Sequence, residues 1–139
     1  MLVKPTENYN SNGYNVKYTF GGTNSVKKNG GERIAGSDRF DTSAKIAAKT
    51  GYKNIAFVSG TSFADALSAV NVVNSKTADI LLTPTNGNKE VSKLAKEAEN
   101  IYIIGGENTL PENNVLAAID GKAISKPIVK KQLNQMKNL

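Results

Sequence analysis

NIAFVSGTSFADALSAV, residues 54–70, shows the architecture of this chain more clearly than any other stretch. Its first five residues are β-prone and almost all apolar, and this lack of polar alternation is typical of a strand covered on both faces. From Ser62, a favourable N-cap with Asp65 three residues later, the pattern becomes helical. The apolar side chains then repeat at the spacing of one helix face, at Phe63, Ala66, Leu67, Val70 and Val73.

The same alternation of strand and helix continues in both directions along the chain. Further strands are expected at 16–20, 79–82 and 101–104, with a weaker one at 32–35. Further helices are expected at 41–49, at 89–99 and from the capping-box pair Thr109 and Glu112 through Ile119. This order predicts an α/β fold, in which a mainly parallel sheet is flanked by helices on both faces in three layers.

Composition divides the 139 residues into three segments. Residues 1–15 are polar and predict a linker or lead-in, whereas 16–120 are long enough for a single α/β module. Residues 121–139 hold five lysines and no acid, which accounts for five of the six net positive charges. This basic tail is expected either to form one more helix, with Val129, Leu133 and Met136 on one side, or to act as a linker.

Several classes of chemistry and location are disfavoured by what the sequence lacks. It has no cysteine, histidine or tryptophan, so thiol and imidazole nucleophiles and zinc sites built on these residues are excluded. No apolar run approaches the roughly 18 residues of a membrane helix, and the first residues do not resemble a secretion signal. We therefore expect no membrane span, and either an intracellular protein or a piece of a longer one.

The loops after the predicted strands are rich in Gly, Ser, Thr and Asn. Ligands of open parallel sheets bind beyond the carboxyl ends of the strands, so SGTS at 59–62 is a candidate anion site. Short strand-to-helix loops also need such residues for turns and caps, and this structural interpretation is the stronger one. Neither nucleotide-binding glycine motif is present, which disfavours a nucleotide enzyme.

GSDRFD, residues 36–41, is the densest polar cluster in the sequence. Asp38 and Asp41 suit the start of a helix, and Arg39 suits an ion pair or a tie to a neighbouring loop. The same carboxylates are also able to perform acid–base chemistry or to bind Mg²⁺. The capping interpretation is favoured over catalysis.

One phrase of the sequence occurs twice. YTFGGTNSV at 18–26 closely matches YIIGGENTL at 102–110, whereas GERIAGSDRFDTSAKIA at 31–47 occurs once. Either the first copy is the closing strand of a repeat whose body is absent, or it is the first strand of this module and only looks similar. The first interpretation predicts that 16–20 has a position in a sheet equivalent to that of 101–104.

Four blocks together resemble the cell-wall-binding repeat 2 family of clostridial and related Gram-positive surface proteins. They are RIAGSDRFDTSAKIA (33–47), AFVSGTSFADALSA (56–69), DILLT (79–83) and IYIIGGENTL (101–110). The resemblance implies a non-catalytic α/β module, without cofactor or metal, that holds a surface protein, autolysin or phage endolysin on the cell wall through an anionic polymer. It also implies an extracellular location, at the wall or cell surface.

The resemblance also suggests which residues bind and how the module assembles. Family members usually carry about three repeats around a pseudo-threefold axis, whereas this chain has one complete copy, 33–120, so we expect a homo-oligomer, with a trimer favoured. Arg33 and Arg39 are the expected charge partners of the polymer. Supporting contacts are expected from Ser37, Asp38, Ser59 and Thr61 and from the tail lysines Lys126, Lys130 and Lys131.

Two other functions fit parts of the sequence. A metal-assisted hydrolase or phosphotransferase would use Asp38, Asp41 and Asp65, provided that the fold brings these carboxylates together. Nucleic-acid binding by the tail is disfavoured because aromatic residues are not interleaved with its lysines and residues 1–120 carry a net charge of only +1. We therefore expect no nucleic-acid partner.

Overall fold

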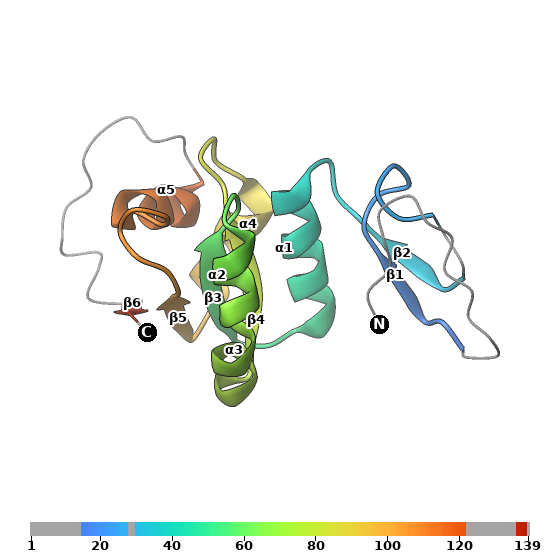
Figure 1. The fold of residues 1–139 in the computed structure, drawn as a ribbon, viewed down its shortest axis with the longest axis horizontal. Coiled ribbons are helices and arrows are strands. Elements are labelled where there is room, and N and C mark those ends of the chain that lie inside the picture. Colours follow the sequence, from blue (N-terminus) through green and yellow to red (C-terminus); the bar gives the residue numbers. More distant parts are fainter. Residues whose placement is uncertain (1–14, 28–29, 122–135, 139) are drawn as a thin grey trace.

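The computed structural model describes residues 15–27, 30–121 and 136–138, and all strands in these ranges pair in parallel (Figure 1). Two sheets are present. The larger one has the order β4 (Ala78–Thr83), β3 (Asn54–Ser59), β5 (Asn100–Ile103), β6 (Met136–Asn138), and the smaller one joins β1 (Tyr18–Phe20) to β2 (Glu32–Ile34). The five strands expected from the sequence are confirmed.

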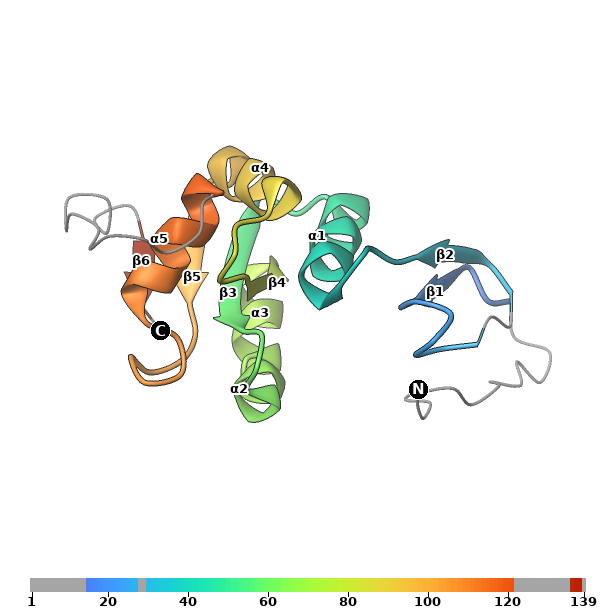
Figure 2. The ribbon, with the colours of Figure 1, turned by 90° about the horizontal axis from the view of Figure 1, so that it is seen from above.

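Helices cover both faces of the larger sheet (Figure 2). One face packs against α1 (Arg39–Thr50), α4 (Lys89–Glu97) and α5 (Glu112–Asp120), and the other packs against α2 (Phe63–Ser68) and α3 (Val70–Lys76). The predicted three-layer α/β fold is therefore confirmed. None of the helices in the described ranges has the length and apolar character needed to cross a bilayer.

The central strands are apolar without alternation because each face supplies a separate core. Phe57 and Ile103 belong to the core under α1, α4 and α5, whereas Val58 and Tyr102 belong to the core under α2 and α3. Phe57 is completely buried, and burying such a side chain is worth about 2–3 kcal/mol.

The helix expected from Phe63 is confirmed, but its predicted apolar stripe is wrong at Leu67 and Val70, whereas Ala66 and Val73 pack on the sheet as expected. The chain forms two short helices, α2 and α3, which meet at Ala69, and Ser62 makes no side-chain capping bond. Ala69 is fully buried, whereas Leu67 and Val70 are 57% and 44% exposed. Helical hydrogen bonds continue across Ala69, and the face that packs on the sheet runs through Ala66, Ala69 and Val73, so Leu67 and Val70 lie outside it.

Two expectations about helix ends need correction. Thr109 and Glu112 do not form a capping box, because Thr109 Oγ1 donates to Gly106 O and α5 begins at Glu112, after Pro111. The tail helix expected beyond Gly121 falls mostly on residues 122–135, which lie outside the described ranges. Met136–Asn138 forms strand β6 beside β5 and is not helical, so the expectation is wrong at that position.

The β1–β2 sheet lies on the far side of α1 from the larger sheet (Figures 1 and 2). Lys49 of α1 links the two parts, since its ammonium group is 3.1 Å from a carboxylate oxygen of Glu32 and 5.3 Å from the centre of the Tyr18 ring. Tyr18 and Phe20 stack on each other with ring centres 6.1 Å apart, and both remain 42–50% exposed. This small sheet is therefore poorly buried.

Candidate functional site

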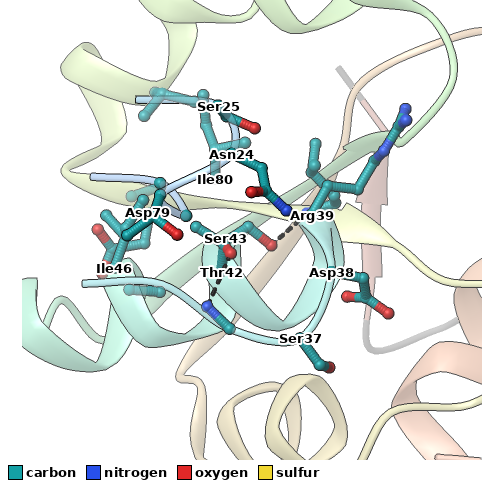
Figure 3. A pocket seen from close by; sticks show the side chains of 18 residues that line it. Asn24, Ser25, Ser37, Asp38, Arg39, Thr42, Ser43, Ile46, Asp79 and Ile80 are labelled. Atoms are coloured by element: carbon teal, nitrogen blue, oxygen red, sulfur yellow. Dashed lines mark hydrogen bonds between the residues drawn. The ribbon is translucent and has the colours of Figure 1, made fainter. Parts of the chain in front are cut away.

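A cavity of about 930 Å³ lies between the turn after β1, the start of α1 and strand β4 (Figure 3). Its wall combines small hydroxyl and amide side chains with one cation and two carboxylates. An apolar floor comes from α1 and β4. The polar side chains that line it are Thr23, Asn24, Ser25, Ser37, Asp38, Arg39, Thr42, Ser43 and Asp79.

Asp38 and Asp41 hold the first turn of α1 together. Asp38 Oδ1 accepts from Asp41 N–H at 2.8 Å, and Asp41 Oδ2 accepts from Ser37 N–H at 3.0 Å. Gly36 N–H donates to Thr42 Oγ1 at 2.9 Å, and a Cβ atom at Gly36 would overlap the Asp41 carboxylate. This reciprocal arrangement is a cap, as the sequence suggested for this cluster.

Arg39 extends from the cavity toward the loop that follows β3. Its Nη1 donates to Gly60 O at 2.8 Å, and Figure 3 shows its guanidinium turned away from Thr42 and Ser43. The side chain is exposed. Arg39 therefore supplies a positive charge between the cavity and the carboxyl end of the larger sheet.

The loop at 59–62 satisfies two of its own backbone N–H donors. Ser59 Oγ accepts from the N–H groups of Thr61 and Ser62, each at 3.2 Å, and lies 3.1 Å from Thr61 Oγ1. The side chain of Ser59 is buried at the end of β3. These bonds shape a tight strand-to-helix turn, which is the structural interpretation favoured from the sequence.

Arg33 lies in β2, away from the cavity, and binds the turn that follows β1. Its Nη1 donates to Gly21 O at 2.5 Å and to Val26 O at 2.9 Å. Its Nη2 is buried and has no hydrogen-bond partner among the described residues. Arg33 thus fixes a turn in this structure and does not present its charge to the cavity.

The structure brings together only part of the predicted binding set. Ser37, Asp38 and Arg39 line the cavity, whereas Arg33, Ser59 and Thr61 do not. The tail lysines Lys126, Lys130 and Lys131 lie outside the described residues. Sequence reasoning missed residues from three separate segments, although the repeated GG turn marked one of these segments: Asn24, Ser25, Thr42, Ser43 and Asp79.

The carboxylates proposed for metal chemistry do not converge. Asp38 and Asp41 cap α1, whereas Asp65 lies in α2 with its Oδ2 beside Gly105. Within 15–27, 30–121 and 136–138, no group of three Asp or Glu side chains is placed to hold a metal ion. The hydrolase arrangement inferred from these three residues is therefore not formed.

Asp79 differs electrostatically from the other polar residues of the cavity wall. Burial raises the pKa of its carboxyl group, and hydrogen bonds from Tyr52 N–H, at 3.3 Å, and from Thr50 partly oppose this effect. Burial favours the neutral form because a charged carboxylate loses hydration.

A family model named cell wall binding domain 2 matches residues 33–115, which is more than half of the chain. The chain belongs to this family. The matched range begins in β2 and ends within α5, so the cell wall binding domain includes the whole larger sheet except β6 and leaves β1 outside. YTFGG at 18–22 therefore lies outside the matched domain.

A solved structure with a similar fold is Cwp8 from Clostridium difficile. The TM-score is 0.67 at 27% sequence identity, and the alignment covers 94% of this chain and 22% of the Cwp8 chain. None of the curated protein sequences compared with the chain matches it. The chain thus spans about a fifth of the length of this larger relative. Its membership in the cell wall binding family supports a cell-wall-binding role.

Proposed function

We propose that this cell wall binding domain holds a larger surface protein or peptidoglycan hydrolase on a Gram-positive wall by binding an anionic wall polymer. The proposal is carried by the family match over residues 33–115. The coverage of only 22% of Cwp8 supports a role as one module of a longer protein. The domain itself is proposed to be non-catalytic and to act at the wall or cell surface.

The cavity beside α1 is the proposed contact surface for the polymer. Its hydroxyl and amide groups suit sugar hydroxyls, which both donate and accept hydrogen bonds. Arg39 is the cation of its wall, and a guanidinium binds phosphate or carboxylate through paired hydrogen bonds. The carboxylate of Asp38 lies in the same wall, so the polymer is expected to place its negative groups on the Arg39 side and its sugars near Ser37 and Thr42.

Substitution Arg39→Gln tests this assignment. We expect binding to purified walls to weaken about tenfold, because charge-assisted hydrogen bonds are worth roughly 1.5–3 kcal/mol. Binding by the unmodified chain should also weaken as salt rises. The measurement is a sedimentation assay with native walls and with walls stripped of anionic polymer.

Lys53→Gln provides the matched control. Lys53 is 75% exposed, pairs with Glu99 at 3.4 Å and precedes β3, at the opposite end of the sheet from Arg39. The substitution Lys53→Gln removes the same charge as Arg39→Gln. It should change binding to walls by less than about twofold, since a solvated surface pair contributes little. Equal losses for the two variants, or undiminished binding to stripped walls, would contradict the proposal.

The module is also proposed to associate with copies of itself, with a trimer favoured over other states. The support is the surface of α2 and α3, where Leu67 and Val70 are 57% and 44% exposed. Adjacent exposed aliphatic side chains of this size gain from being covered. An exposed apolar surface of this kind suits a closed ring in which each copy contacts the next.

A further inference from the structure

The cavity beside α1 carries opposite charges on its two sides. Asp79 of β4 lies on one side and Arg39 of α1 on the other, and the guanidinium of Arg39 is turned away from Asp79 (Figure 3). Among the described residues, no ion pair joins these two side chains or links either of them to a third. A cavity of this kind suits a ligand that itself carries a positive and a negative group.

Asp79 is a buried carboxylate without a cation beside it. The residue is 8% exposed, and its Oδ2 accepts from Tyr52 N–H at 3.3 Å, with a further hydrogen bond from Thr50. None of the ion pairs within 15–27, 30–121 and 136–138 includes it. Burial raises the pKa of its carboxyl group because desolvation penalises the charged form. Folding has therefore removed hydration from this group without supplying a countercharge.

The lysines of the neighbouring helix do not supply that countercharge. Lys45 is 3.5 Å from Asp41 Oδ2, and Lys49 is 3.1 Å from Glu32 Oε2. Both ammonium groups are thus paired with other carboxylates. Among the described side chains, none provides a positive partner for Asp79.

Asp38, the other carboxylate that lines the cavity, is a poorer place for a positive ligand group. It is exposed, and its Oδ1 already accepts from Asp41 N–H in the cap of α1. A solvated carboxylate gains little from a further cation. Asp79 has already lost its hydration in the folded chain, so a ligand ammonium there has only its own desolvation to overcome.

We propose that Asp79 binds a primary ammonium group of the wall polymer while Arg39 binds an anionic group of the same polymer unit. The ligand class is a sugar unit that carries both a free amine and an acidic group. This inference rests on the proposed function, because it takes the cavity as the contact surface of the polymer, and it adds a requirement for the amine. The volume of about 930 Å³ lies within the range of roughly 300–1,000 Å³ typical of ligand sites.

Two soluble sugar phosphates test the requirement for an amine. Glucosamine 6-phosphate and glucose 6-phosphate differ only in the amine or hydroxyl group at carbon 2. We expect the full chain to bind the amine about tenfold more tightly, because an ammonium–carboxylate contact is stronger than a neutral hydrogen bond. N-acetylglucosamine 6-phosphate, whose amide is neutral, should bind no better than glucose 6-phosphate. NMR titrations that follow the backbone amides around the cavity measure these affinities.

Asp79→Asn assigns the preference to this carboxylate. The substituted amide keeps an oxygen that accepts from Tyr52 N–H but carries no charge, so a purely structural role is preserved. The variant should bind glucosamine 6-phosphate and glucose 6-phosphate equally, within about twofold. Asp120→Asn is the matched control, since Asp120 is exposed in α5 and loses the same charge, and it should retain the tenfold preference. Arg39→Gln should weaken both probes by a similar factor and leave the preference in place.

Acetylated walls extend the test to the polymer itself. Acetic anhydride converts wall amines to neutral amides and leaves phosphates negative, so the wall becomes more anionic. Because the chain has a net charge of +6, purely electrostatic attraction would then increase. Recognition of an ammonium group predicts the opposite result, a loss of about tenfold in sedimentation with the walls.

Treatment of walls with hydroxylamine distinguishes two sources of the amine. Hydroxylamine removes aminoacyl esters and leaves amino sugars intact. Given the loss on acetylation, an equal loss with hydroxylamine assigns the ammonium group to an ester-linked amino acid. Undiminished binding after hydroxylamine assigns it to an amino sugar, and both results support an amine as the recognised group.

Three results would overturn the proposal: equal binding of the two soluble probes by the unmodified chain, a preference that survives Asp79→Asn, and undiminished binding to acetylated walls. The first and third use the unmodified chain, so they decide the matter even if Asp79→Asn does not fold. Failure of the proposed function has a different signature. It would leave binding undiminished on walls stripped of anionic polymer, with no effect of Arg39→Gln on either probe.

Discussion

The carboxyl group of Asp79 shows how a single residue of the cavity wall links burial to stability. It lies at the start of β4, where it is 8% exposed, and it receives a hydrogen bond from Tyr52 N–H. Burial raises its pKa above the ordinary value of 3.8. Between the pKa of this group in the unfolded chain and its higher pKa in the folded chain, the folded state binds more protons. The free energy of unfolding therefore falls as pH rises through that interval.

We therefore expect Asp79→Asn to become relatively more stabilising as pH rises. The difference in unfolding free energy between the variant and the original chain should shift in favour of the variant between about pH 3 and pH 7, because the substituted amide carries no charge to desolvate. Urea titrations at several pH values measure this difference. A burial effect should persist at about 0.5 M salt, and a difference independent of pH would contradict the assignment.

Gly36 controls the start of α1 through the space it leaves. The Asp41 carboxylate folds back over Gly36 to reach Ser37 N–H, and any Cβ at this position would overlap it. The same carboxylate is 3.5 Å from Lys45 in the next turn. A short loop can thus carry two acids and an arginine for purely local reasons, which is why composition alone does not identify a catalytic cluster.

At the scale of the helix, Gly36→Ala should destabilise the chain by about 1–3 kcal/mol through loss of the cap and local overpacking. Gly106→Ala is the matched control, because a Cβ at Gly106 meets nothing within 4 Å, and it should change stability by less than about 0.5 kcal/mol. Thermal unfolding of both variants measures the difference. A tolerated Gly36→Ala would show that the cap contributes little.

Elements whose local patterns agree with their packing were predicted best. The strand at 54–59 and the helices α1 and α4 match expectation because apolar positions, caps and covering layers all favour the same structure. The stripe through α2 and α3 failed at Leu67 and Val70 because the face that packs on the sheet runs through Ala66, Ala69 and Val73. Strand β6 failed because its neighbour, β5, lies far away in the sequence.

At the scale of the whole molecule, oligomeric state is the property most open to measurement. We expect light scattering to give the mass of a trimer at high concentration and a smaller mass on dilution, since the exposed surface around Leu67 and Val70 is modest in size. Leu67→Asp should shift the chain to monomer. Glu97→Asp, a conservative change on α4, should leave the mass unchanged, and a monomer at every concentration would reject the trimer.

The sequence by itself determined the family, the α/β class and nearly every strand, because these depend on local apolar patterns and on motif order. It also identified the repeated GG phrase and the polar loop at 36–41. It could not determine which of these polar residues share a cavity. Asn24, Thr42 and Asp79 come from separate segments, and only tertiary packing makes them neighbours.

The tertiary structure alone decided the roles of the charged residues. Arg33 was expected to face a ligand, but parallel pairing of β2 with β1 directs it onto the turn after β1. Asp65, a helix-cap candidate by sequence, has a buried carboxylate oxygen without a hydrogen-bond partner among the described residues, beside Gly105 in the turn that follows β5. The physical reason is that local sequence sets backbone preferences, whereas the partner of a buried charge depends on which distant segments the fold brings to it.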